Sequence, residues 1–250
     1  MHGLLEALLL FGAGLAAGVI NTLAGGGSLL TLPVLIFMGL PPHVANGTNR
    51  IGIVLQALVG TAGYRSKGVS TFPFNVYLGV AAFFGALIGA QIAVDIRGEL
   101  FNRILAIIMI IVVAIIVLKP KVEALHLPER LTGRYLFYAV VGFFFIGIYG
   151  GFINAGIGFI IMLFLHHVNR LSLIKTNATK VALVFIYSLG ALGLFAWNDA
   201  IDWKIGMILA LGSSFGAWWS SRWSVEQGEG VIKIAMVVMV TAMSIKLWLF

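Results

Sequence analysis

The sequence predicts an all-α, polytopic helical membrane protein of about ten segments, arranged as two inverted five-helix repeats. Composition gives the first two observations: 60% of the 250 residues are hydrophobic and only 10% are charged. Soluble domains carry about 25% charged residues, so this chain is expected to be solvated largely by lipid. The third observation is that apolar stretches near the roughly 17–25 residues required by a bilayer core recur along the chain, for example at 76–94.

Polar and Pro/Gly-rich punctuation divides the chain into ten hydrophobic segments. They cover approximately 4–20, 28–40, 46–64, 73–94, 101–118, 134–153, 157–167, 173–196, 203–222 and 231–249. The first is interpreted as a transmembrane helix and not as a cleaved signal peptide, because no Lys or Arg precedes its apolar run. The main polar stretch lies at the midpoint. We therefore divide the chain into a first repeat (1–118), a polar cytoplasmic linker (119–133) and a second, inverted repeat (134–250).

Three pairs of motifs recur between the two halves. GLAAGVIN (14–21) matches GIYGGFIN (147–154), NGTN (46–49) matches NATK (177–180), and GVAAFFGALIGA (79–90) matches GMILALGSSFGA (206–217). The offsets are 133, 131 and 127 residues, a drift that loops can absorb. Because five spans are an odd number, the second half should enter the membrane from the opposite face, which is the inverted repeat typical of secondary transporters.

The distribution of cations predicts the sidedness, because Lys and Arg accumulate in cytoplasmic loops. One face, which carries the loops after segments one, three, five, seven and nine, holds Arg65, Lys67, Lys119, Lys121, Arg130, Arg134, Arg170, Lys175, Arg222 and Lys233. The other holds Arg97, Arg103, Lys204 and Lys246. The first face is therefore predicted to be cytoplasmic, with both termini outside. The net charge of +7 is attributed to this topology and not to a nucleic-acid partner.

Segments 28–40 and 157–167 are too short to cross a bilayer as straight helices. At 1.5 Å per residue they reach about 16–20 Å, against a hydrocarbon core of about 30 Å. Each follows a flexible break, NTLAGGGS at 21–28 and NAGIG at 154–158. Short segments after Gly-rich breaks at corresponding places in two halves indicate a transport site. Glycines there can bring backbone N–H groups close to a ligand, and the helix that follows attracts anions at its N-terminus.

Other glycines call for a different interpretation. Gly85, Gly89, Gly212 and Gly216 are spaced four apart within long predicted helices. Small residues at this spacing allow close helix packing in membrane bundles, and we assign these four to that role.

Arg50 and Lys180 lie within the first few turns of the third and eighth segments and are expected inside the membrane. At the centre of a helix such a cation costs roughly 2.5–3.5 kcal/mol, so its presence needs a reason. A bound anion, snorkelling to the interface and a hidden ion pair are the three interpretations. The acids lie in predicted loops or near segment ends, which favours the anion. Strict alignment pairs Asn49 with Lys180, so Arg50 is one residue out of register.

The predicted substrate-binding residues combine both breaks with both motifs. They are Asn21, Gly25, Gly26, Gly27, Ser28, Asn46, Thr48, Asn49, Arg50, Asn154, Gly156, Gly158, Asn177, Thr179 and Lys180. No catalytic or metal site and no cofactor is predicted, and the chain is not expected to be an enzyme. It has no Cys and no H-E-x-x-H motif, and the adjacent His166 and His167 would point about 100° apart on a helix.

The stretches GLAAGVINTLAGGGSLLTLPVL, HVANGTNRIG, GGFINAGIGF and KTNATK resemble the TauE/SafE sulfite exporter family, also called the toluene-sulfonate uptake permeases. The resemblance covers nearly the whole chain. It implies transport of a small sulfur-containing anion (sulfite, thiosulfate or an organosulfonate such as sulfoacetate) across the bacterial cytoplasmic (inner) membrane. The second motif departs from the first, with Lys180 in place of Asn and no Gly triplet before it. An anion channel and a non-transporting membrane scaffold stay open as alternatives.

Overall fold

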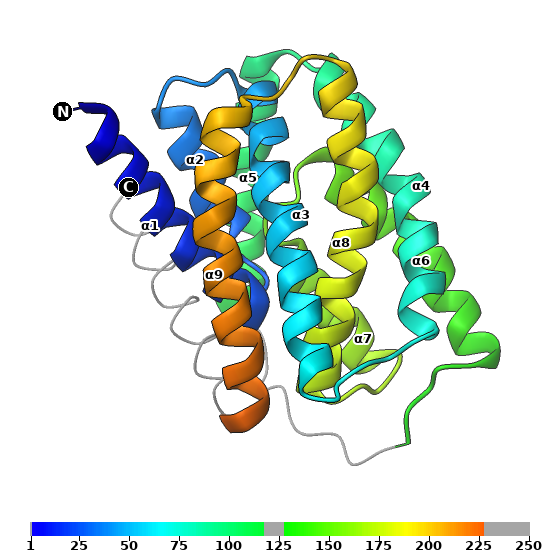
Figure 1. Ribbon diagram of the computed structural model, residues 1–250. Coiled ribbons are helices and arrows are strands. Elements are labelled where there is room, and N and C mark those ends of the chain that lie inside the picture. Colours follow the sequence, from blue (N-terminus) through cyan, green and yellow to red (C-terminus); the bar gives the residue numbers. More distant parts are fainter. Residues whose placement is uncertain (1, 118–127, 228–250) are drawn as a thin grey trace.

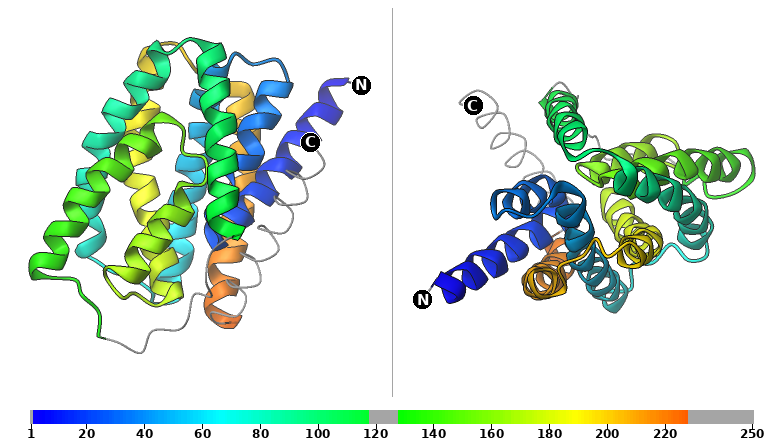
Figure 2. Two further views of the ribbon diagram at one scale, coloured as in Figure 1. Left: turned by 180° about the vertical axis from the view of Figure 1, so that it is seen from behind. Right: turned by 90° about the horizontal axis from the view of Figure 1, so that it is seen from above.

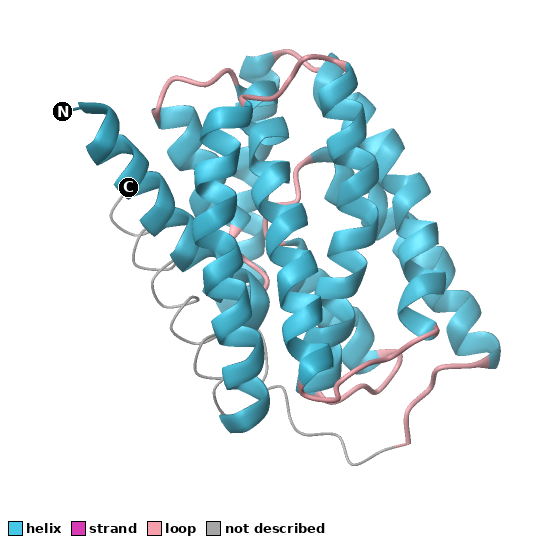
Figure 3. Ribbon diagram, viewed as in Figure 1, coloured by secondary structure: helices cyan, strands magenta, loops and turns pink. Residues whose placement is uncertain are grey.

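The computed structural model describes residues 2–117 and 128–227. Within these ranges all regular secondary structure is helical (Figures 1 and 3). The helices are α1 (His2–Leu23), α2 (Ser28–Phe37), α3 (Pro42–Ser66), α4 (Phe74–Asp95), α5 (Gly98–Val117), α6 (Gly133–Phe152), α7 (Ile157–His167), α8 (Leu173–Trp197) and α9 (Trp203–Gln227). They correspond to the first nine predicted segments, whereas the tenth, at 231–249, lies outside the described residues together with most of the linker.

Four described helices, α1, α4, α6 and α8, are long and apolar enough to cross a membrane. The two interrupted segments are short helices, as predicted: α2 has 10 residues and α7 has 11. Helix α2 ends at Phe37, before Gly39 adopts a φ of +93°. Helix α3 begins at Pro42, four residues before the predicted boundary, because proline is well accommodated in the first turn of a helix.

The long helices pack side by side in the order α1, α9, α3, α8, α4, α6 (Figure 1). Helices α3 and α8 form the centre, α9 lies between α1 and α3, and α4 lies between α8 and α6. If helices are paired as the predicted repeats would pair them (α1 with α6, α3 with α8, α4 with α9), this order reads the same from either end. Helices α2 and α7 extend toward opposite ends of the bundle (Figure 2).

Glycine contacts join the outer helix pairs, as the sequence predicted. A Cβ atom on any of the four packing glycines would collide with a backbone carbonyl of the facing helix: Phe144 for Gly85, Ile148 for Gly89, Phe11 for Gly212 and Leu15 for Gly216. Helix backbones can approach this closely only where side chains are absent. The α4–α6 and α1–α9 contacts therefore depend on these positions.

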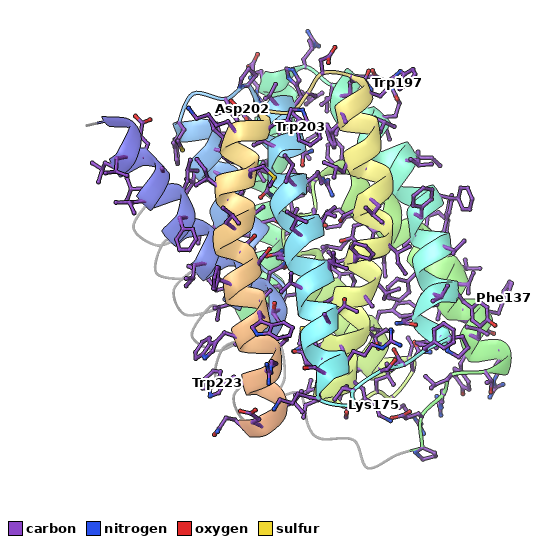
Figure 4. All side chains as sticks on the ribbon, in the orientation of Figure 1. Phe137, Lys175, Trp197, Asp202, Trp203 and Trp223 are labelled. Carbon is purple, nitrogen blue, oxygen red and sulfur yellow. The ribbon has the colours of Figure 1, made fainter. Side chains whose placement is uncertain are left out.

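Tryptophans mark the two ends of the bundle. Figure 4 places Trp197 and Trp203 at one end of the bundle and Trp223 toward the other end, which also carries Lys175. Trp197 is 88% exposed, and Trp219 stacks on Trp223 with ring centroids 5.0 Å apart. Tryptophan is enriched at the level of lipid headgroups, so the two groups indicate where a bilayer would end on this molecule.

Candidate functional site

The two helix breaks meet inside the bundle (Figure 3). The first separates α1 from α2 at residues 24–27, and the second separates α6 from α7 at 153–156. The backbone N–H of Gly158 donates a hydrogen bond of 3.1 Å to the carbonyl oxygen of Gly25. Gly25 has a φ of +86° and Gly156 a φ of +71°, a left-handed conformation that glycine adopts without steric cost.

The C-terminal end of α6 is held by side chains of α3. The Asn46 Nδ2 atom donates to the Phe152 carbonyl at 2.7 Å. Two guanidinium nitrogens of Arg50 donate to the Gly150 and Gly151 carbonyls, each at 2.6 Å. The last carbonyls of a helix lack partners within the helix and carry its negative dipole end. Arg50 and Asn46 therefore cap α6.

The C-terminal end of α1 is held in the same way by α8. The Asn177 Nδ2 atom donates to the Leu23 carbonyl at 3.0 Å. The Lys180 Nζ atom donates to the Thr22 carbonyl at 3.0 Å and to Asn177 Oδ1 at 2.7 Å. Each half of the chain thus supplies an Asn and a cation that cap the broken helix of the other half.

These contacts explain the one-residue shift between the two motifs. Arg50 follows Asn46 by four residues and Lys180 follows Asn177 by three. Positions three and four residues apart lie on the same face of a helix, so both cations reach the carbonyl that precedes the one bound by their asparagine.

The burial and the contacts of Arg50 and Lys180 test two of the three interpretations of these cations, namely snorkelling and a hidden ion pair. Arg50 is 0% exposed and Lys180 is 1% exposed, so neither snorkels to the interface. The ion pairs among the described residues are Lys67–Glu226, Arg103–Glu99 and Lys175–Glu129, and none involves these two cations. In this structure the negative charge near each cation comes from a helix C-terminus, which the sequence interpretation had not considered.

The two motif threonines bind loops of the opposite half. Thr48 Oγ1 accepts a hydrogen bond of 2.8 Å from the backbone N–H of Asp202, directly before α9. The hydroxyls of Thr179 and Thr71 are hydrogen-bonded at 2.7 Å, and Thr71 lies in the loop three residues before the start of α4. Both threonines therefore fix the entrance to a long helix.

A small pocket lies beside the first break, and we name it the α2 pocket. Its lining residues come from α2 and its preceding loop, α3 and α9: Gly27, Ser28, Thr31, Asn49, Gly52, Ile53, Gln56, Leu209 and Ser213. Asn49 Oδ1 accepts a hydrogen bond of 2.8 Å from the Thr31 hydroxyl. Asn49 Nδ2 is buried and has no hydrogen-bond partner within the described part of the chain, so this pocket contains an unused amide donor.

A second donor faces the same pocket because of a chain of hydrogen bonds from the other half. The Tyr187 hydroxyl donates to Asn154 Oδ1 at 2.6 Å, and Asn154 Nδ2 donates to Ser28 Oγ at 3.1 Å. Since Ser28 Oγ accepts this bond, its own proton is available to another acceptor. The backbone hydrogen bonds of the break also leave the N–H groups of Gly26, Gly27 and Ser28 without a carbonyl acceptor among the described residues. The pocket lining therefore combines several donors with no carboxylate.

The fifteen predicted site residues separate into groups in the structure. The α2 pocket is lined by Gly27, Ser28 and Asn49. The helix caps are formed by Asn46, Arg50, Asn177 and Lys180, and the loops before α4 and α9 are held by Thr179 and Thr48. The junction of the two breaks is formed by Gly25, Gly26, Asn154, Gly156 and Gly158. Asn21 is half-buried on α1, with its Cβ atom close to Gly27. The sequence interpretation missed Thr31, Gln56 and Ser213. Gln56 offered a signal, since it is a polar residue two helical turns after Asn49.

An all-helical bundle with apolar spans, exposed tryptophans at both ends and two buried helix breaks defines a polytopic membrane protein. The family model described as "Sulfite exporter TauE/SafE" matches residues 10–247, and the chain belongs to this family. The names of the family and of its relatives indicate a membrane transporter.

Curated relatives resemble the chain over nearly its whole length. A probable membrane transporter protein, ORF9, from a Sinorhizobium species is 29% identical over 95% of this chain and 90% of its own. A probable membrane transporter protein from Haemophilus influenzae is 27% identical over 96% and 93% of the two chains. The probable membrane transporter protein YfcA from Escherichia coli K12 is 28% identical over 95% and 88%. No solved structure gives a significant match.

Proposed function

We propose that this protein is a secondary transporter that moves a small sulfur-containing oxyanion, such as sulfite, thiosulfate or sulfoacetate, by alternating access, with the anion bound in the α2 pocket. The observation that carries this proposal is the Asn49 Nδ2 donor, which has no hydrogen-bond partner among the described residues and faces a pocket whose described lining contains no carboxylate. An oxyanion offers only acceptors, so it complements the donors of Asn49 and Ser28 and the positive end of the α2 dipole.

Alternating access is supported by the reciprocal contacts. We interpret 1–118 and 134–250 as inverted repeats joined by a cytoplasmic linker at 119–133. The symmetric helix order, the exchanged Asn–cation caps and the exchanged threonine contacts favour this interpretation. If the halves exchange conformations, the breaks open first to one side of the membrane and then to the other.

In this proposal the main role of Arg50 and Lys180 is to hold the helix ends at the two breaks in place. The two terminal guanidinium nitrogens of Arg50 are occupied by carbonyls, while its Nε–H lacks a partner among the described residues. The two buried cations nevertheless make the interior of the bundle positive, which favours an anion in the nearby pocket.

The test is uptake of radiolabelled sulfite, thiosulfate, sulfoacetate and taurine into proteoliposomes, alongside the thermal shift of purified protein with the same anions and with sulfate and carboxylate controls. Asn49→Leu should raise the Michaelis constant at least tenfold or abolish uptake. Asn198→Leu removes an exposed amide of similar size and should change neither. Equal uptake by both variants would overturn the assignment of the pocket.

The two alternatives predict different outcomes in this assay. A carrier accelerates uptake of labelled anion when unlabelled anion is present on the other side, whereas a channel does not. A scaffold gives no uptake and no thermal shift with any anion.

A further inference from the structure

The cations of the two helix caps differ in one chemical respect. Arg50 caps α6 and Lys180 caps α1, by equivalent contacts to backbone carbonyls. A guanidinium stays protonated in proteins under all ordinary conditions, whereas an alkylammonium can release its proton when buried. One cap of the protein is therefore permanently charged and the other can titrate.

The surroundings of Lys180 favour a change of protonation. Its Nζ atom contacts the Thr22 carbonyl, Asn177 Oδ1 and, at 3.8 Å, the Met162 sulfur. None of these partners carries a full negative charge that would hold the proton. An ammonium can donate one N–H group to each of these three atoms, whereas a neutral amine has only two N–H groups and turns a lone pair toward one of the three acceptors. The neutral amine also loses the attraction between a full positive charge and the negative end of the α1 dipole.

The titratable and charged groups on this side of α8 are few among the described residues. They are Tyr64 from α3, hydrogen-bonded to Ser224 of α9; His166 from α7, hydrogen-bonded to the Leu171 carbonyl; Arg50 from α3, on the α6 cap; and Lys175 and Tyr187 on α8 itself, hydrogen-bonded to Glu129 and Asn154. Each is already engaged with another partner. Lys180 is thus the titratable group in direct contact with the end of α1.

The contacts of Lys180 lead directly to the α2 pocket. Lys180 and Asn177 bind Thr22 and Leu23 at one end of the first break. Gly27 and Ser28, at the other end of the same break, line the pocket. Residues 24–27 lie between them, so a movement of the α1 end changes the position of the donors that would contact an anion.

We propose, on the basis of the transport function above, that Lys180 is the proton-binding residue that couples anion transport to a proton gradient. With the anion present, the protonated Lys180 holds the α1 end closed. Release of the proton to water on the far side frees the break and lets the anion leave, so proton and anion move in the same direction. Many secondary transporters bind sodium at helix C-termini and unwound carbonyls. Among the described residues, the carbonyls of Thr22, Gly150 and Gly151 at the ends of α1 and α6 accept hydrogen bonds from Lys180 and Arg50 instead.

The experiment uses the full chain in proteoliposomes, with labelled sulfoacetate and the membrane potential clamped at zero. Counterflow exchange is measured first, because it requires transport but no proton gradient. Wild-type protein should then accumulate sulfoacetate about tenfold across a gradient of one pH unit, since one proton is carried per anion. Lys180→Met, which resembles the deprotonated cap, should keep counterflow and lose accumulation. Lys180→Arg, which cannot release a proton, should lose both. Lys175→Arg, a matched change at an exposed lysine two residues before Asn177, should keep both.

Each outcome bears on the proposal. Counterflow without gradient-driven accumulation in the wild type would overturn proton coupling and leave the transport function intact, whereas absence of counterflow with every anion of the panel would overturn both. Tenfold accumulation by either Lys180 variant would overturn the role of Lys180. If both variants lose counterflow, calorimetry of sulfoacetate binding to wild-type protein in two buffers of different ionisation enthalpy decides: uptake of protons supports the proposal and no uptake overturns it.

Discussion

The backbone N–H of Gly158 donates a hydrogen bond to the carbonyl oxygen of Gly25, which joins the two helix breaks at the centre of the bundle. The two residues are 133 positions apart in the sequence. A Cβ atom on either one would overlap the backbone of the other. Helices α2 and α7 therefore begin from one shared junction, and displacement of either short helix acts on the other.

Gly158→Ala should lower the melting temperature and abolish transport, because the new methyl group has no space between the two backbones. Gly193→Ala is the matched control, since it lies in α8 with no atom within 4 Å of the added Cβ. Replacing a helical glycine with alanine stabilises a helix by roughly 0.5–1 kcal/mol, so the control should melt at the same or a higher temperature. Thermal unfolding in detergent measures both, and equal melting of the two variants would contradict the tight junction.

Arg50→Met should destabilise the protein strongly, because the buried Gly150 and Gly151 carbonyls lose their donors. Each unsatisfied buried group costs about 1–3 kcal/mol. Arg50→Lys should recover only part of the loss, since an ammonium lacks the planar fork that reaches both carbonyls. Arg103→Met, at an exposed pair with Glu99, should stay within about 0.5 kcal/mol of wild type. Equal melting temperatures for the Arg50 and Arg103 variants would show that the α6 cap contributes nothing.

Thr48→Val should loosen the entrance to α9, because the Asp202 N–H loses its acceptor while the shape of the side chain is nearly kept. The loss of one hydrogen bond of about 1 kcal/mol corresponds to roughly five times faster amide exchange at that position. Thr179→Val should leave Asp202 protected and act instead on the loop that contains Thr71. Hydrogen exchange monitored on peptides covering 66–74 and 198–203 distinguishes the two effects. Identical patterns in both variants would argue against separate contacts.

The sidedness can be tested with single cysteines, since the chain contains none. Ser70 is exposed in the loop before α4, on the predicted cytoplasmic face. Asn198 is exposed after α8, at the opposite end of the bundle. In intact cells a membrane-impermeant maleimide should label Asn198→Cys at once and Ser70→Cys only after permeabilisation. The reverse pattern would invert the assigned topology.

The sequence was sufficient to predict the helical class, the two short helices and the glycines at helix contacts. Composition and spacing decide these features locally: α2 and α7 are short because glycine-rich breaks precede them, and Gly85 contacts the α6 backbone because it lies on a small-residue face. The presence of two buried cations was also evident from the sequence around Arg50 and Lys180.

The partners of those cations could not be predicted. Their acceptors are backbone carbonyls, which every residue possesses, so the acceptors at Thr22 and Gly151 are distinguished only by where α1 and α6 end. The α2 pocket was hidden for a similar reason. Thr31, Asn49 and Gln56 come together only after α2 folds back along α3, and no local pattern specifies that fold.

The exchanged caps also have a consequence for how the protein is made. The carbonyls of Thr22 and Leu23 accept hydrogen bonds from Lys180 and Asn177. The codons of these two residues are translated long after those of α1, so the carbonyls lack these donors until then. At about 5–20 residues per second, the ribosome needs on the order of ten seconds or more to reach them. During that interval the end of α1 has no cap from its own chain, and it must remain near the polar surface of the membrane or the insertion machinery. The first half is thus expected to insert loosely and to reach its final depth only when α8 arrives.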